Sequence, residues 1–271
     1  SLNLEQSIEQ LGYQPSLKID EQPIKVFAKR RIAGNDLYFF HSEKPEFRQV
    51  TVELLDEEGQ GIPEIWNNTD GTIESVTSYR REGDHIVLDL ALEPYASRFI
   101  LLRRDNQTPE YTGTYSQLVQ DLYVNSATNS KVTELKGAWN VEFDRRWAGP
   151  GLVTFDDLQD WTEHSDSGVK HYSGTANYYK TFVASQAQAA STKPIYLDLG
   201  QVEQIAEVTL NGKKLATLWK PPFALDISSA LVAGTNQLEV TITNTWVNRL
   251  IGDEALPDTS GYKMVGDTVP W

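Results

Sequence analysis

Four residues near the end of the chain are of the types that bind sugars. Trp246, Asn248, Arg249 and Asp253 all lie within one short stretch. An indole ring offers a flat apolar face to the C–H groups of a sugar, and the three polar side chains can hydrogen-bond its hydroxyl groups. The stretch therefore predicts carbohydrate binding. Two alternatives stay open, namely that the indole packs in a core and that Arg249 and Asp253 form a buried ion pair.

Further aromatic residues extend this candidate site. The chain contains 7 tryptophans, and several of them lie in loop-like contexts, with Trp219 just before Pro221 and Pro222. Sugar contacts compete here with packing inside or between domains, because large aromatic side chains dominate protein cores. The predicted carbohydrate-binding residues are Trp161, Tyr172, Trp219, Trp246, Asn248, Arg249 and Asp253.

Paired carboxyl groups are the other candidates for chemistry. Cleavage of a glycosidic bond needs two carboxyl groups held across the sugar, one of them with a raised pKa. The acidic residues considered are Asp156, Asp157, Asp160, Asp226, Asp253 and Glu254. All of them lie in turn or loop contexts, where carboxylates cap helices and hydrogen-bond turns. The sequence therefore predicts no catalytic residue in this chain.

Metal and cofactor motifs are missing from the sequence. There is no cysteine, and the 4 histidines lack ligand spacing. The polar stretch 67–71 lacks the acidic first residue of a calcium loop, and a hairpin turn explains it better. No phosphate-binding loop, dinucleotide fingerprint or nucleophile elbow is present. We predict no cofactor and no metal site, with a structural calcium ion left open.

Composition narrows the class of protein further. The 271 residues carry a formal net charge of −14, which disfavours binding to nucleic acid. Hydrophobic residues make up 39% of the chain, enough for packed cores. The longest apolar runs, such as 99–102, are far too short to cross a bilayer, so no membrane insertion is expected.

A two-residue hydrophobic period predicts a first small antiparallel β-sandwich over residues 23–105. Turn signals rich in Gly, Asn and Asp separate the apolar runs, and helical periodicity is almost absent. The expected strands are 25–32, 37–41, 48–55, 72–79, 85–91 and 97–103.

The β pattern resumes in residues 132–271, where about eight strands with long loops predict a jelly-roll sandwich. Its clearest local signal is Asn211-Gly212 between two alternating runs, which is typical of a type I′ hairpin. The expected fold class is therefore all-β with two antiparallel sandwiches.

Two segments fall outside these sandwiches. Leu4, Ile8 and Leu11 share one helical face and Gly12 ends it, so we expect residues 1–22 to be the helical tail of a missing upstream domain. Residues 106–131 are rich in Asn, Gln, Thr and Ser and predict a linker. Within it, the apolar cluster at 118–123 favours one docked helical turn.

An ordered series of motifs carries a resemblance to a known family. The second sandwich resembles the galactose-binding-like domain at the C-terminus of bacterial family 106 glycoside hydrolases, the α-L-rhamnosidase-like enzymes, and it is similar to the sugar-binding domain of family 2 glycosidases. The motifs are GAWNVEF (137–143), LQDWT (158–162), YSGTANY (172–178), LDLG (197–200), VTLNG (208–212), LWKPP (218–222) and TNTWVNRLIGD (243–253). In the first sandwich, AKRR (28–31), LYF (37–39), EIW (64–66) and LEPYAS (92–97) resemble the domain that follows the catalytic barrel of these enzymes.

The resemblance implies a role as well as a fold. In that family an upstream barrel carries the catalytic carboxylates, and no part of this chain matches it. The expectation is a non-catalytic C-terminal accessory region of a glycoside hydrolase, with that barrel and a carbohydrate as partners. Because such enzymes act on polymers, a periplasmic or extracellular location is expected. The alternatives are an autonomous binding module for rhamnose-containing plant glycans and a purely structural brace.

Overall fold

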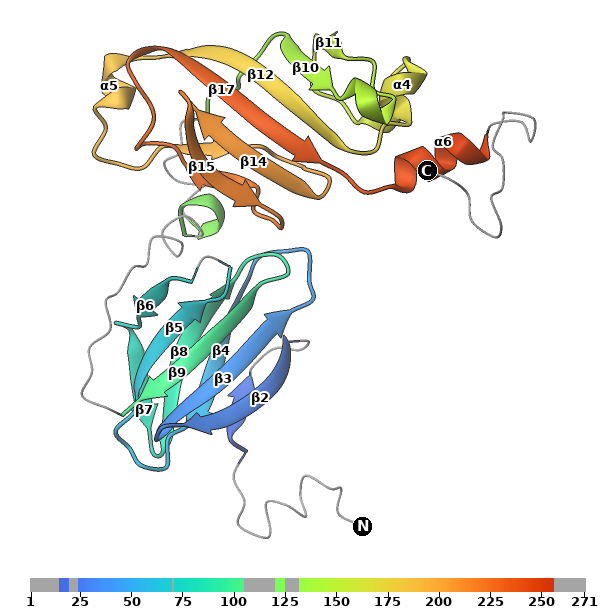
Figure 1. Cartoon of the computed structure of the whole chain (residues 1–271). Coiled ribbons are helices and arrows are strands. Elements are labelled where there is room, and N and C mark those ends of the chain that lie inside the picture. Colours follow the sequence, from blue (N-terminus) through green and yellow to red (C-terminus); the bar gives the residue numbers. More distant parts are fainter. Residues whose placement is uncertain (1–14, 20–23, 70, 105–119, 125–131, 256–271) are drawn as a thin grey trace. The chain divides into compact units, whose positions relative to one another are not determined.

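The computed structural model of the chain describes residues 15–19, 24–69, 71–104, 120–124 and 132–255. The chain divides into two compact units, Ser1–Lys131 and Val132–Trp271 (Figure 1). Every strand pairing in the described ranges is antiparallel and the helices are short, which confirms the predicted all-β class. None of the helices in these ranges has the length and apolar character needed to cross a bilayer.

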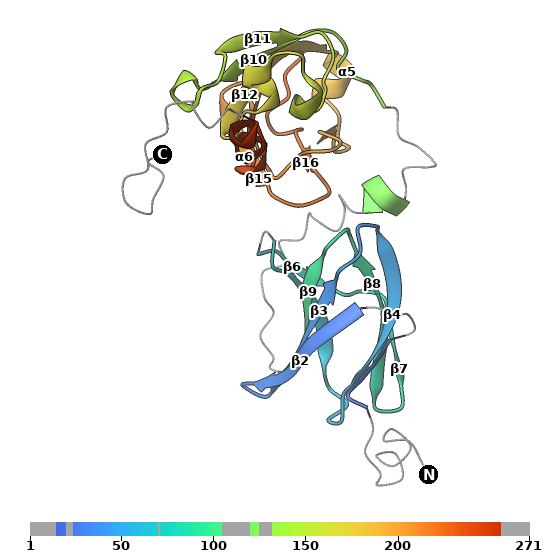
Figure 2. The same cartoon turned by 90° about the vertical axis from the view of Figure 1, so that its right-hand side faces the viewer.

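The first unit is a sandwich of two sheets, which Figure 2 shows as separate layers. The four-stranded sheet has the order β1 (Leu17–Ile19), β4 (Arg48–Leu55), β8 (His85–Leu92), β7 (Tyr79–Glu82). The five-stranded sheet has the order β2 (Ile24–Ile32), β3 (Asn35–Ser42), β9 (Ser97–Arg103), β5 (Ile62–Asn67), β6 (Ile73–Ser75).

Alternation along the strands builds the core of the first unit. Successive side chains of a strand point to opposite faces of its sheet. In β4 this buries Val50, Val52 and Leu54 completely or nearly so. They join Tyr38 of β3 and Ile100 of β9 in one hydrophobic cluster. Each fully buried side chain of this kind stabilises the fold by roughly 1.5–3 kcal/mol.

Three features of the first unit differ from the sequence-based expectation. Leu17–Ile19 is not part of a tail but the edge strand β1, paired with β4, because its alternating side chains complete that sheet. The expected strand 72–79 is two strands, β6 and β7, in different sheets. Strand β5 was absent from the expected strands, and it pairs with β6 and β9 although Pro63 has no backbone N–H to donate.

The predicted helical turn in the linker is present at η1 (Gln120–Val124), where the ring of Tyr123 stacks on Phe47 with centroids 5.1 Å apart. Residues 1–14 and the remainder of the predicted linker lie outside the described residues, so the helix expected over Leu4–Leu11 stays a prediction.

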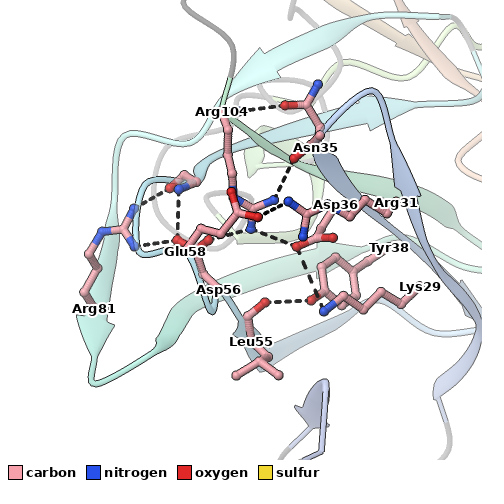
Figure 3. A network of polar contacts seen from close by, with 12 residues as sticks. Lys29, Arg31, Asn35, Asp36, Tyr38, Leu55, Asp56, Glu58, Arg81 and Arg104 are labelled. Atoms are coloured by element: carbon pink, nitrogen blue, oxygen red, sulfur yellow. Dashed lines mark hydrogen bonds and ion pairs between the residues drawn. The ribbon is translucent and has the colours of Figure 1, made fainter.

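A network of charged side chains closes one end of the first sandwich (Figure 3). Asp56 is completely buried at the end of β4. One of its oxygens accepts a hydrogen bond from Arg104 at 2.6 Å, and the other accepts hydrogen bonds from Arg81 at 2.7 Å and from the Gly61 amide at 2.9 Å. Arg104 also donates to Asp36 at 2.8 Å. The network therefore joins the residue after β9 to the start of β3, and joins both to β7 and to the loop after β4.

The second unit contains one large sheet and one small sheet. The six-stranded sheet has the order β11 (Leu152–Phe155), β10 (Trp139–Phe143), β12 (Thr175–Ala184), β17 (Gly234–Thr243), β14 (Ile205–Leu210), β15 (Lys213–Leu218). The small sheet pairs β13 (Tyr196–Asp198) with β16 (Ala224–Asp226). The helical segments are η2 (Arg145–Trp147), η3 (Trp161–Glu163), α4 (Ser167–Lys170), α5 (Gln186–Ala189) and α6 (Val247–Glu254).

The predicted hairpin joins β14 to β15. Asn211 and Gly212 have φ values of 53° and 77°, the left-handed pair that a type I′ turn requires, so the turn prediction is confirmed. The Asn211 amide also donates hydrogen bonds to Ala230 O at 2.9 Å and to Asn236 Oδ1 at 2.8 Å. The turn is thus tied to the loop before β17 as well as to its own strands.

Aromatic side chains fill one end of the second core. Phe143 makes edge-to-face contacts with Trp161 and Tyr172, at centroid distances of 5.2 and 5.0 Å. Phe155 packs on the other side of the cluster, 6.2 Å from Phe143 and 6.1 Å from Tyr178. Such offset contacts add about 0.5–1.5 kcal/mol per pair beyond burial.

Candidate functional site

Helix α6 turns its apolar face away from the rest of its own unit. Val247, Leu250 and Ile251 are three or four residues apart and so share one face of the helix. Their side chains are 51 to 55% exposed. In Figure 1, α6 continues past the end of β17 and stands at the edge of the unit. This orientation is the reverse of an ordinary surface helix, which buries its apolar stripe.

The opposite face of α6 is held against the unit by close contacts. A Cβ atom at Gly252 would lie 2.7 Å from Cβ of His171, so only glycine allows this approach. The backbone N–H of Arg249 donates to the buried Ser173 Oγ at 2.9 Å. Before the helix, the Asn244 side chain accepts from Gly174 N at 2.8 Å and donates to Tyr172 O at 3.0 Å. The helix is therefore fixed in its inverted orientation.

Two half-exposed indole rings adjoin the helix. Trp246 immediately precedes α6 and packs edge-to-face on Trp147 of η2, with centroids 5.7 Å apart at 77°. The two rings are 50% and 54% exposed. Asp144 caps η2 by accepting a hydrogen bond from Arg146 N at 2.9 Å. After η2, the backbone at Gly149 packs directly on Phe143 and Tyr172, an approach that leaves no space for a Cβ atom. We call Trp147, Trp246, Val247, Leu250 and Ile251 the α6 face.

Five of the predicted site residues keep part of their surface exposed. Trp219 follows β15 and is 58% exposed, and Trp246 is half exposed. Asn248, Arg249 and Asp253 are half-buried on α6. Arg249 Nε and Asp253 Oδ1 are 2.9 Å apart, so the predicted ion pair exists, although the two side chains keep about a third of their surface exposed. The structure thus brings Trp246, Asn248, Arg249 and Asp253 together on one short helix, while Trp219 belongs to a different element.

The prediction of sugar contacts was wrong for Trp161 and Tyr172. Both belong to the aromatic core, with only 8% and 2% of their surfaces exposed. The Trp161 indole N–H donates to the Tyr178 hydroxyl, and the Tyr172 hydroxyl donates to Thr175 O at 2.8 Å. Burial raises the pKa of Tyr178 to about 12 and also raises that of Tyr172. The sequence placed Trp161 in a loop-like context, but η3 turns its ring into the core.

Three of the six candidate carboxylates are engaged in a cap, a turn or an ion pair. Asp160 caps η3 by accepting from Thr162 N at 2.8 Å. Asp226 accepts from Ser228 N at 2.8 Å, and Asp253 pairs with Arg249. Asp156 and Asp157 are exposed on the segment after β11, and Glu254 is exposed on α6. Within the described ranges, no three His, Asp or Glu side chains gather as a metal ion requires.

Sequence reasoning missed the α6 face itself. It named no helix over residues 244–252, although Val247, Leu250 and Ile251 already show the helical i, i+3, i+4 spacing. No sequence pattern points to the residues that anchor α6, namely His171, Ser173 and Gly252. Their role depends on contacts between α6 and the segment after α4, which are distant in the sequence.

Comparison with known proteins finds similar sequences and structures among glycosidases. The family described as "Glycosyl hydrolase 2 galactose-binding domain-like" matches residues 157–267. A protein of Formosa agariphila named "Putative beta-glucuronidase" is 45% identical over 150 residues, which are 54% of this chain and 13% of that protein. The matched region of the chain is therefore similar to a galactose-binding-like domain of glycosidases.

A solved structure resembles both units. The rhamnosidase from Novosphingobium sp. PP1Y matches with a TM-score of 0.74 and 26% identity, over 94% of this chain and 23% of that chain. Because 94% exceeds the share of either unit alone, the likeness includes residues of both. The chain spans less than a quarter of the length of each of these two proteins.

Proposed function

We propose that this chain is a non-catalytic accessory region of a larger glycoside hydrolase resembling the family 106 α-L-rhamnosidases. The observation that carries the proposal is the rhamnosidase match, which takes in 94% of this chain but only 23% of the enzyme. Three of the six carboxylates that sequence analysis considered also support it, since Asp160, Asp226 and Asp253 are engaged in a cap, a turn and an ion pair. In this role the two units support a catalytic domain supplied by the same polypeptide.

The role defines the partners and the place of action. The main partner is a catalytic barrel elsewhere in the polypeptide, and the substrate is a carbohydrate polymer. Polymers of this kind are degraded in the periplasm or outside the cell, which is where we place the protein. The role requires no cofactor in this chain.

An activity comparison tests the proposal. The 271-residue chain and the complete product of its gene are each assayed with 4-nitrophenyl α-L-rhamnoside and 4-nitrophenyl β-glucuronide. The expected result is release of nitrophenol from the rhamnoside by the complete product and no rate above buffer for the 271 residues. Cleavage by the 271 residues alone would overturn the proposal. Cleavage of only the glucuronide by the complete product would reject the family 106 assignment and keep the accessory role.

A second candidate function is carbohydrate binding by the chain itself, as an autonomous module for rhamnose-containing plant glycans. The exposure of the Trp219 and Trp246 rings favours it, because an exposed indole face can stack on a sugar ring. Calorimetry with rhamnose-containing oligosaccharides measures it. Trp219→Ala or Trp246→Ala should weaken the affinity at least tenfold, whereas Tyr95→Ala, an exposed aromatic of the first unit, should leave it unchanged. An affinity that survives both tryptophan substitutions would remove this candidate.

A further inference from the structure

We infer that the α6 face is an intramolecular docking surface for an apolar patch of the same polypeptide outside these 271 residues. The inference rests on the proposed function, and it adds which surface of the accessory region makes the contact. The face consists of Trp147, Trp246, Val247, Leu250 and Ile251, all about half exposed.

The exposure of this face is not explained by the unit itself. Helix packing stabilises a protein when the apolar side is buried, at about 25 cal/mol per Å² of apolar surface removed from water. Here the buried side carries Gly252 and the Arg249 backbone contact, while three large aliphatic side chains face outward. Scattered apolar residues on a surface are ordinary, but here three of them share one helix face and two adjoining indoles contact each other, which marks an interaction site.

The anchoring contacts prevent α6 from rolling over to bury its own apolar face. Rotation would replace Gly252 with a larger side chain at a place where even a Cβ atom would lie only 2.7 Å from Cβ of His171. It would also break the Arg249 N–Ser173 Oγ hydrogen bond and leave a buried hydroxyl without that partner. The face is therefore preorganised, so little conformational entropy of the helix is lost when a partner binds.

The two tryptophans give the face the character of a binding hot spot. Trp is enriched among the residues that dominate interface energies, and such residues cluster with apolar neighbours that exclude water. The edge-to-face contact of Trp147 with Trp246 holds both rings in place. Exposed Glu254 lies at the end of the helix, so basic side chains on the partner would complement its edge.

The size of the face identifies the kind of partner. A stable interface between separate proteins takes about 20–30 residues from each side, and the α6 face offers five. A covalently linked partner needs less surface, because linkage supplies a high effective concentration. The similar rhamnosidase and the Formosa protein both have most of their length outside the matched region. The remainder of such a polypeptide is thus a better occupant than a second copy of the chain.

Site-specific photo-crosslinking in the complete gene product tests the inference. A benzoylphenylalanine replaces Leu250 in one protein and Val183 in a control, since Val183 is an exposed apolar residue of β12 outside the face. Irradiation and peptide mass spectrometry then identify the crosslinked partner. We expect crosslinks from position 250 to peptides of the same polypeptide outside the 271 residues, at least fivefold above the control.

Every other result overturns the inference. Crosslinks between two copies would assign the face to self-association, and crosslinks within residues 256–271 would assign it to this chain. A yield equal to that at position 183 would mean that the face stays exposed. The mass of the complete gene product shows whether such a result rejects only the docking surface or also the proposed function. A natural product of 30.5 kDa would reject the accessory role itself, whereas a larger product without the expected crosslinks rejects only the docking surface.

A substitution pair gives an independent check. Leu250→Asp with Ile251→Asp should leave the melting temperature of the 271-residue chain unchanged, because both side chains are exposed there. The same pair should lower the melting temperature of the complete product by several degrees, and Val183→Asp should not. A fall in the short chain, or no fall in the complete product, contradicts docking.

Discussion

The two units stabilise their interiors by different chemistry. In the described residues, every buried charged side chain belongs to the first unit. They are Asp36, Asp56, Glu64, Glu93 and Arg98. The buried polar residues of the second unit are Ser173 and Asn236, and its core end is instead a cluster of aromatic rings. The half-exposed indoles Trp147, Trp219 and Trp246 also lie in the second unit.

This difference separates a unit whose buried charges are paired within it from a unit that exposes three indole rings. In the first unit, Glu64 binds the Arg103 guanidinium at 2.6 and 2.9 Å, and Glu93 binds Arg98 at 2.5 Å. A buried pair adds little net stability compared with apolar residues, but loss of one partner is severe because a charge stays buried. The described part of the second unit contains no buried charge that could lose its partner, and its large side chains lie in the core and on the α6 face.

The largest expected effect comes from breaking the network around Asp56. Asp56→Ala removes the carboxylate that accepts from Arg104 and Arg81, and leaves the nearly buried Arg104 guanidinium with less counter-charge. We expect the first unit to lose about 3–5 kcal/mol of unfolding free energy. Urea denaturation followed by hydrogen exchange of peptides from each unit measures the loss, and the second unit should be unchanged.

An exposed ion pair of the same unit provides the control. Glu82→Ala breaks the Arg80–Glu82 pair, whose side chains are both more than half exposed, and should not shift the urea midpoint measurably. If Asp56→Ala behaved like Glu82→Ala, the buried network would not distinguish the first unit from the second.

The aromatic core of the second unit should respond in the complementary way. Trp161→Ala removes a ring that contacts Phe143 and Tyr172 and donates to Tyr178, and should lower the unfolding free energy of the second unit by roughly 3–5 kcal/mol. Hydrogen exchange of the first unit should stay as it was. A variant that remains as stable as the parent but loses sugar binding would restore Trp161 as a sugar contact.

Acid should separate the two units without any substitution. Burial raises the pKa of Asp56, but hydrogen bonds from Arg81 and Arg104 outweigh it and hold the pKa below its ordinary value. Its stabilisation is therefore complete above the unfolded pKa of about 3.9 and is lost as the pH falls through the lower folded value. In the second unit Asp144 also has a lowered pKa, through Arg146, but this pair is on the surface and screened.

The measurement is the urea midpoint of each unit at pH 7, 5 and 3. We expect no change for either unit between pH 7 and 5, and a larger fall at pH 3 for the first unit. Alkali should not separate the units, since burial raises the pKa of Tyr178 in the second unit to about 12 and also raises that of Tyr38 in the first, so both should weaken above pH 10. Equal acid sensitivity of both units would contradict the role of the network.

The sequence predicted those features that local patterns encode. Strand β4 was expected at 48–55 and lies at Arg48–Leu55, because alternation in an antiparallel strand leaves its period in the sequence. The Asn211-Gly212 turn was also predicted correctly, because the dipeptide itself specifies the turn. Strand β5 was not, since its pairing with β9 overrides the usual effect of Pro63.

The candidate site was less predictable because it depends on orientation. Trp161 and Trp246 look alike in sequence, each in a polar loop-like context, yet one ring lies in the core and the other is half exposed. The sequence around α6 does not indicate that the helix packs through Gly252. This packing follows from the close approach of His171, which lies in a distant segment of the chain.

The smallest expected effect concerns a type of hairpin turn that occurs once in each unit among the described residues. The β2–β3 hairpin turns at Ala33-Gly34 with φ values of 49° and 82°, almost the same geometry as Asn211-Gly212. A left-handed conformation costs a residue with a Cβ about 1–2 kcal/mol, and Asn tolerates it better than Ala. Ala33→Asn should therefore raise the unfolding free energy of the first unit by about 0.5–1 kcal/mol.

Urea denaturation checks this gain, with the reverse exchange as its counterpart. Asn211→Ala should cost the second unit more than Ala33→Asn adds to the first, because it also removes the hydrogen bonds to Ala230 and Asn236. If Ala33→Asn had no effect while Asn211→Ala was destabilising, the value of Asn211 would lie in its side-chain hydrogen bonds alone. The two hairpins would then differ in the way that the two cores do, by the contacts their side chains make and not by the backbone they share.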